Sequence, residues 1–211
     1  MIGLAVYAGA RIPHGVGTPE FIGTAQGNNG TTVSLPAHAA GDLIIALGKG
    51  TGGGTPAASS GWTTPANGTW SFPEGVLGFR LQYIVDADNT ITSATANSPG
   101  GTGFLIYRNA TFGAVTPLSS AGGSSSLAAP SLSSSGGSGS TMVYIFHESL
   151  GNDFTSISGP VVERYVQLSG MGGGFARMLD SGVLVPVSPA STATVSLPSF
   201  IGSVVFELLP A

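Results

Sequence analysis

A strand-like unit that occurs twice in the chain constrains its fold more than any other feature. In the first copy, residues 31–36 read TTVSLP, and the apolar run GDLIIALG of residues 41–48 follows after four residues. In the second copy, residues 193–198 read ATVSLP, and GSVVFEL at residues 202–208 follows after a link one residue shorter. Short β-prone or apolar runs bounded by glycine or proline indicate strands. Each copy therefore predicts a short strand followed by a buried one.

Other segments continue the pattern of short strands between turns. Residues 77–86 alternate between apolar and other side chains, which predicts a strand with one buried face. Residues 21–25, 103–109 and 142–147 are further strand candidates, and residues 161–168 favour a strand over a helical turn. No segment shows the sustained apolar period of about 3.6 residues that marks an amphipathic helix. The sequence therefore predicts an all-β chain, an antiparallel sandwich or jelly roll of about ten to twelve short strands.

Turn residues give further local expectations. We expect a turn over residues 70–75, and a turn after Asp86 that lets residues 90–96 pair back on the preceding strand. Residues 175–184 resemble a hairpin, and the Ser/Gly-rich residues 119–141 leave room for two short strands at most. The centres of the apolar runs predict the core residues Ile44, Leu81, Tyr83, Ile106, Ile145 and Val205.

The chain is unusually poor in charge, and this limits its partners. Charged residues are 8% of the 211, the net charge is −4, and the six lysines and arginines are scattered. A phosphate backbone needs a cluster of cations, so nucleic-acid binding is not expected. A surface of hydroxyl groups and backbone costs little to desolvate, which suits a protein packed against copies of itself or a partner. A small neutral domain without such contacts is the alternative.

The absence of cysteine and of long apolar segments indicates the compartment in which the protein is made. The chain has no cysteine, which excludes a disulfide scaffold and a Cys-ligated metal. Residues 1–10 lack the basic start and apolar run of a signal peptide, and no stretch has the length of a membrane span. We therefore expect synthesis in a cytoplasm and no membrane partner.

The first residues form a separate unit in the sequence. We expect residues 1–18 to be an N-terminal arm and residues 19–211 to be a single β-sandwich domain, because prolines and glycines separate the two. A lone apolar segment behind such a hinge suits addition to a neighbour's sheet edge or groove, and folding back as an edge strand is the alternative. The apolar residues assigned to assembly are Ile2, Leu4, Val6 and Tyr7.

The residues that could carry chemistry do not form a known catalytic or cofactor motif. Residues 48–53, GKGTGG, fit a dinucleotide-binding pattern, but no helix is expected after them. His147, Glu148 and Asp153 are the densest polar cluster, yet no Gly-x-Ser-x-Gly elbow accompanies them. We interpret His147 and Glu148 as the water-facing end of a core strand. Asp86 and Asp88 are interpreted as solvated turn residues. We therefore expect no enzyme activity, no cofactor and no metal.

Two tryptophans allow one binding hypothesis. Trp62 and Trp70 flank a Gly/Pro-rich region and could form a sugar-stacking platform. A tryptophan after such a loop more often closes the end of a sandwich core. Both interpretations remain open at this point.

A series of short motifs resembles a group of tailed-bacteriophage virion structural proteins. In order, the motifs are Leu-Pro at residues 35–36, GDLI at 41–44, GWTT at 61–64, RLQY at 80–83 and Tyr-Arg at 107–108. The resemblance covers roughly residues 20–110 and brings no catalytic residues with it. The Gly/Ser-rich segment 119–141 departs from the pattern.

This resemblance implies a non-enzymatic role in the virion. The first expectation is a head decoration (cement) protein that forms homo-oligomers, with a trimer as the expected state, and binds the major capsid or tail protein of the same particle. The alternative is a tail-associated module that binds carbohydrate or a receptor. Copy number per particle separates the two, because decoration proteins are present in hundreds of copies.

Overall fold

The computed structural model describes residues 17–51, 54–71, 78–136, 139–166 and 175–211. Within these residues the chain forms β-strands and no helix, and every strand pairing is antiparallel. The strands are β1 (Glu20–Gly27), β2 (Thr32–Ser34), β3 (Asp42–Lys49), β4 (Thr69–Ser71), β5 (Gly78–Asp86), β6 (Ser93–Thr95), β7 (Thr102–Arg108), β8 (Ala110–Val115), β9 (Ser119–Ala128), β10 (Thr141–Glu148), β11 (Phe154–Ser158), β12 (Val162–Val166), β13 (Phe175–Asp180) and β14 (Thr192–Pro210). The predicted all-β, sandwich-like class is confirmed, and the described residues contain 14 strands where about ten to twelve were expected.

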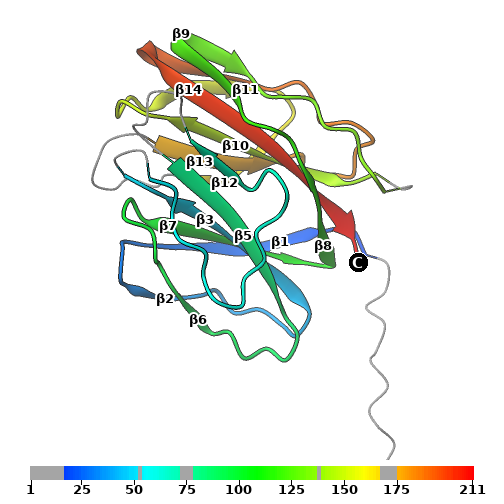
Figure 1. Cartoon of the computed structure of the whole chain (residues 1–211). Helices are drawn as coiled ribbons and strands as arrows, with labels where there is room; N and C mark the ends of the chain where they lie inside the picture. The colour runs from blue at the N-terminus through cyan, green and yellow to red at the C-terminus, as the bar shows by residue number, and fades with distance from the viewer. Residues whose placement is uncertain (1–16, 52–53, 72–77, 137–138, 167–174) are drawn as a thin grey trace, which may run out of the picture.

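One layer of the sandwich is a five-stranded sheet in the order β1-β7-β3-β5-β4. β3 is buried along its whole length, because it is central in this sheet and both of its faces are covered. A short two-stranded ribbon, β2 with β6, lies outside this sheet, at the bottom of Figure 1. Residues 91–98, which include β6, line a common pocket with Ala46 and Gly48, two outward-facing residues of β3.

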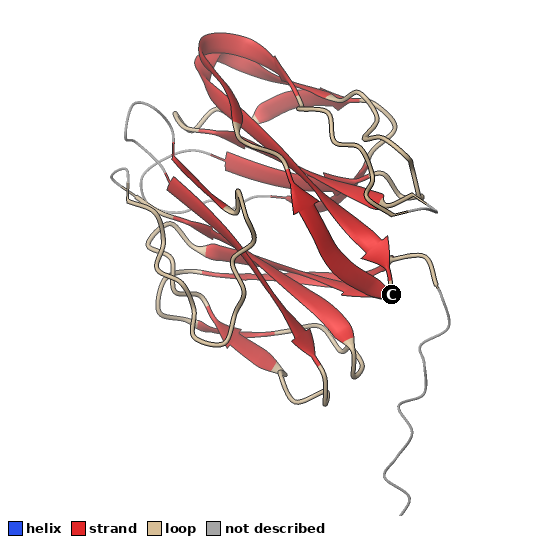
Figure 2. Cartoon of the chain, turned by 45° about the vertical axis from the view of Figure 1, so that its right-hand side comes forward, coloured by secondary structure: helices blue, strands red, loops and turns tan. Residues whose placement is uncertain are grey.

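The second layer is a seven-stranded sheet organised on β14, which has 19 residues. On one side, β14 pairs first with β11 and then with β10, and β13 and β12 continue the sheet beyond β10. On the other side it pairs with β9 and β8. The long strand crosses the upper part of the molecule, and loops join the strands at both ends of the sandwich (Figures 1 and 2).

Two apolar clusters hold these layers together. The larger one lies between the two sheets, where Ile45 and Leu47 of β3 belong to the same cluster as Ile145 of the facing sheet. The smaller cluster lies on the opposite face of β10, around Tyr144 and Phe146, and is covered by β11 and the first half of β14. The seven-stranded sheet is therefore apolar on both faces along β10.

The expected core is largely confirmed. Of the six expected core residues, five have side chains that are 0% exposed: Ile44, Leu81, Ile106, Ile145 and Val205. The sixth, Tyr83, was expected to be buried but is only partly buried. Its ring stacks on Phe112 of β8, with 4.5 Å between the ring centroids, and closes the edge of the larger cluster.

The expected one-sided burial of residues 77–86 is also only partly correct. On the expected buried face, Phe79 and Leu81 are 0% exposed, but Val85 is 47% exposed. On the opposite face, Gln82 and Asp86 are buried at 5% and 1% exposure. Segments that lie outside the five-stranded sheet cover these two side chains.

Three local expectations are wrong. Residues 193–198 and 202–208 are not two strands but parts of β14. Residues 93–95 pair with β2 and not with β5. The hairpin expected over residues 175–184 is replaced by β13, which pairs with β10 and β12, and by Val185, which bridges to Ser140.

Further differences concern short or polar segments. Trp70, expected in a turn, is the centre of β4. β9 is one ten-residue strand in the Ser/Gly-rich segment, and the sequence does not predict β8 or β11. The residues of the expected arm, Ile2, Leu4, Val6 and Tyr7, lie outside the described residues, as do residues 167–174.

Candidate functional site

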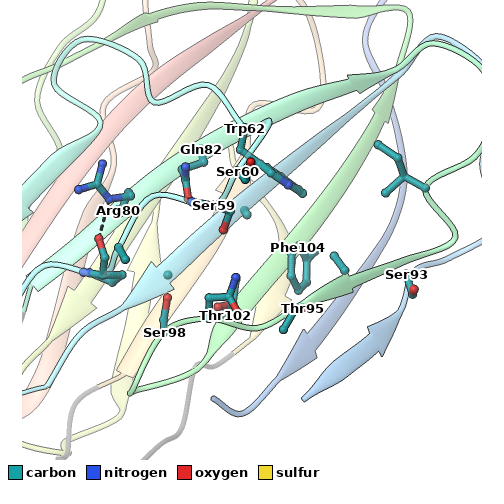
Figure 3. Close-up of a pocket in the computed structure, with 17 residues that line it drawn as sticks. Ser59, Ser60, Trp62, Arg80, Gln82, Ser93, Thr95, Ser98, Thr102 and Phe104 are labelled. Atoms are coloured by element: carbon teal, nitrogen blue, oxygen red, sulfur yellow. Dashed lines mark hydrogen bonds between the residues drawn. The ribbon is translucent and has the colours of Figure 1, made fainter. Parts of the chain in front are cut away.

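A pocket of about 320 Å³ lies on the outer face of the five-stranded sheet. Its floor comes from β3, β5 and β7, and its walls come from residues 56–62 on one side and residues 91–98 on the other. Figure 3 shows Arg80 at the left of the lining residues, Gln82, Ser59 and Thr102 to its right, Trp62 and Phe104 beyond these, and Ser93 farthest to the right.

Strand alternation explains which side chains reach this pocket. In β3, Leu43, Ile45 and Leu47 face the core, so Ala46 and Gly48 face outward. These two outward residues are small, and they leave space above the sheet. A Cβ added at Gly48 would collide with the hydroxyl oxygen of Ser98 in the wall, so the wall approaches the floor closely at this point.

The structure places the two tryptophans in different surroundings. Trp62 is partly buried and lines the pocket, with its ring centroid 6.2 Å from that of Phe104. Trp70 is 6% exposed and belongs to the core between the sheets, where it stacks on Phe79. Only Trp62 of the hypothetical sugar platform therefore faces the pocket.

Two buried polar side chains of the lining each have a hydrogen-bonding atom without a partner among the described residues. The backbone N–H of Ser59 donates to Gln82 Oε1 at 3.2 Å, which fixes the orientation of the amide because an N–H can only donate. Within the described part of the chain, Gln82 Nε2 and Thr102 Oγ1 have no hydrogen-bond partner, although each residue is only 5% exposed. Buried polar groups are normally paired, so unpaired ones in a pocket indicate where a ligand would bind.

Arg80 gives the pocket a positive charge. Its Nε donates to the carbonyl oxygen of Pro56 at 2.6 Å, and its Nη1 donates to Thr64 Oγ1 at 3.3 Å. Both of these partners are neutral. None of the described residues that line the pocket is an aspartate or a glutamate.

His147 is a core residue and not the water-facing strand end that the sequence predicts. It is 0% exposed, and Trp70 Nε1 donates to its Nε2 at 3.1 Å. The centroid of its ring lies 4.5 Å from that of Phe79. Burial, together with the nearby charge of Lys49, lowers the pKa of His147 to about 3. A neutral imidazole fixed in this way links the two sheets.

Glu148 is also buried and has a structural role. Its carboxylate accepts hydrogen bonds from the backbone N–H groups of residues 150–152 and from the hydroxyl of Ser199. Asp153, the third member of the predicted cluster, instead pairs with Arg177 at 2.8 Å. His147, Glu148 and Asp153 therefore do not form a nucleophile–base arrangement.

His38 and Asp86 form a buried pair that the sequence does not suggest. His38 Nε2 lies 2.9 Å from Asp86 Oδ2, and its Nδ1 lies 2.7 Å from the carbonyl oxygen of Pro36. Asp86 also accepts from the N–H groups of Thr90 and Ile91, so the expectation of a solvated turn residue is wrong. Since both ring nitrogens face acceptors, the imidazolium form of His38 is favoured and orders this loop.

The described part of the chain lacks two other features that could indicate a function. It contains no group of three histidine, aspartate or glutamate residues placed to hold a metal ion. None of its segments is a helix long and apolar enough to cross a membrane. The pocket beneath Trp62 is the candidate site that the unpaired polar atoms and Arg80 indicate. Comparison with protein-family models, curated proteins and solved structures found no match.

Proposed function

We propose that this chain is a non-enzymatic structural protein of a bacteriophage virion, a capsid decoration protein that self-associates as a trimer and stabilises the particle. The motif resemblance suggests the virion, and the edge strand β9 supports assembly. Among the described strands, β9 pairs only with β14. Its other edge is therefore available to a second copy of the chain.

The composition of β9 makes this edge suited to pairing. Proteins commonly protect sheet edges with charge or proline. β9 reads SSAGGSSSLA and has neither, and its residues are exposed or partly exposed. An irregularity near Gly123, whose φ is 62°, bends the strand but adds no charge. A trimer requires a head-to-tail contact, so β9 would meet a different edge of the next copy.

The charges of the chain also leave its surface suited to assembly. Arg108 pairs with Asp42, and Arg164 pairs with Asp180. Both carboxylates are buried at 1% exposure. Charge that is already paired within the chain does not have to be stripped of water when two copies meet, which lowers the cost of a polar interface.

A lysine on the edge strand tests the proposal. Ser125 is exposed in β9, so Ser125→Lys should preserve folding but place a charge at the contact. We expect about a tenfold or greater weakening of self-association, measured by sedimentation velocity. Binding to particles that lack the protein should weaken in parallel.

The matched control is Thr90→Lys, which adds the same charge at an exposed turn residue away from β9. It should assemble as the parent does. A parent chain that stays monomeric at all concentrations, or equal assembly of Ser125→Lys and the parent, would contradict the proposal.

A second candidate function is favoured by the pocket. A carbohydrate- or receptor-binding module on a phage tail would need a concave site with an aromatic surface and a few polar groups. Trp62, Gln82 and Thr102 supply these features. The number of copies per particle distinguishes this candidate from decoration.

A further inference from the structure

We infer that the pocket beneath Trp62 binds an acidic sugar, a pyranose that carries a carboxylate such as a uronate or a sialate. This inference rests on the second candidate function and names its ligand class. One cavity combines a cation whose partners are neutral, two polar atoms left unpaired by the described residues, and an aromatic wall.

The positive charge of Arg80 favours a negatively charged ligand. The other described arginines, Arg108, Arg164 and Arg177, each contact a carboxylate. Arg80 instead donates to the carbonyl oxygen of Pro56 and to the hydroxyl of a threonine, and it lines the cavity. With no acid among the described lining residues, the pocket favours an anion. A guanidinium has five N–H donors, so Arg80 retains donors for a carboxylate.

The neutral groups select a polyhydroxylated ligand. Gln82 Nε2 can donate to a sugar hydroxyl, and Thr102 Oγ1 can donate or accept. A hydroxyl group does both, so a sugar can satisfy these two atoms together. An inorganic anion would satisfy the donors but would leave the aromatic wall without a partner.

The shape of the site sets the ligand's size and orientation. About 320 Å³ is near the lower end of ligand pockets, and it suits a monosaccharide or disaccharide. In Figure 3, Arg80 lies at one end of the lining, and Trp62 and Phe104 lie beyond Gln82 and Thr102 as seen from Arg80. The carboxylate is therefore placed near Arg80, and the ring lies toward Trp62.

Matched sugars test the inference. Calorimetric titration would compare galacturonate with galactose and glucuronate with glucose, and would include N-acetylneuraminate and inorganic phosphate. At least one acidic sugar should bind about tenfold or more tightly than the neutral sugars and phosphate, because a charge-assisted hydrogen bond is added. Trp62→Ala should weaken this binding.

Two arginine variants separate local from general charge effects. Arg80→Gln should reduce the affinity for the acidic sugar about tenfold or more and leave neutral-sugar binding little changed. Arg177→Gln, on the other sheet, removes the same charge and should have no effect. Its partners Asp153 and Glu163 have side chains that are 57% and 37% exposed, so neither carboxylate is left buried and unpaired and this variant should fold. Circular dichroism checks the fold of each variant.

The results that overturn the inference are distinct from those that overturn carbohydrate binding. Equal affinity for acidic and neutral sugars, or an unchanged affinity in Arg80→Gln, overturns the acid preference but leaves a carbohydrate site. Phosphate binding as tight as that of the sugars overturns the sugar class. If no sugar binds at concentrations up to about 10 mM, both the inference and the second candidate function fail.

Discussion

Buried carboxylates fix the loops and strand ends of this chain. Glu207 is 0% exposed and accepts hydrogen bonds from Ser135, Ser140 and the backbone N–H of Ala114. Burial raises its pKa, but these donors lower it by more, so the net shift is downward. Glu207 therefore stabilises the fold above the pKa of an unfolded glutamate, and this contribution is lost as the pH falls through the lower folded pKa.

His38 predicts a loss of stability at higher pH. Burial lowers its pKa, but the hydrogen bond to Pro36 and the charges of Asp86 and Asp42 raise it by more, so the net shift is upward. The contribution of His38 is complete below an unfolded pKa of about 6.5 and is lost as the pH rises through the folded value. Urea unfolding at several pH values should show the free energy of unfolding falling above about pH 6.5.

His38→Gln isolates this effect, because glutamine does not titrate. The variant should be less stable than the parent at a pH of about 6, and the difference should narrow as the pH rises. Asp86 and His147 have lowered folded pKa values and titrate on the acid side. Parallel pH profiles for the parent and the variant would contradict the assignment of His38 as a buried imidazolium.

At the scale of elements, the contact of β14 with β10 depends on Gly202. A Cβ at this position would collide with the ring of His147, which pairs with Gly202 across the two strands. Because Phe79 and Trp70 hold that ring, Gly202→Ala should lower the free energy of unfolding by about 1–3 kcal/mol in urea denaturation.

A double-mutant cycle checks the cause of this loss. In a His147→Ala background the ring is absent, so Gly202→Ala should cost much less than in the parent. Gly54→Ala is a control, because the nearest non-neighbouring atom to its added Cβ is at 3.6 Å. Equal costs of Gly202→Ala in the two backgrounds would show that the ring is not responsible.

The strands that could be predicted are those with strong apolar patterns. β3, β7 and β10 are apolar on both faces, and their runs of residues mark them directly. β8, β11 and β4 are short and less strongly patterned, so partners that are distant in sequence determine them. The sequence divides β14 at Pro198, but its pairing with β11 ends at Val195 and that with β10 begins at Ile201. Pro198 therefore lies between these two pairings, where neither β11 nor β10 needs a backbone N–H from β14.

The candidate site could be predicted only in part. The loop around Trp62 identifies that residue, but the other wall and the floor come from residues 46–48, 80–82, 91–98 and 102–104. Strand order brings these segments together, and sequence spacing does not reveal it. The burial of Glu148 and Asp86 could not be predicted for the same reason. Backbone N–H groups of folded loops donate to both carboxylates and offset the cost of burying them, and these loops are placed only by the fold.

At the scale of the whole molecule, the two sheets should unfold together. Their shared core and the hydrogen bond from Trp70 to His147 join them. In Trp62→Phe, Trp70 is the single remaining tryptophan and reports on the interface between the sheets. Its fluorescence and the far-UV circular dichroism should change at the same urea concentration. Separate midpoints would show that the sheets unfold independently.

The central position of β14 has a consequence for synthesis on the ribosome. β8, β9, β10 and β11 all pair with β14, yet all of them are translated before it. At a translation rate of about 5–20 residues per second, on the order of 10 seconds pass between the synthesis of β8 and that of β14. During that time the uncharged residues of β9 have no native strand beside them. The nascent chain is then most exposed to mispairing with other nascent copies on the same messenger RNA, so early contact between copies would be a folding hazard.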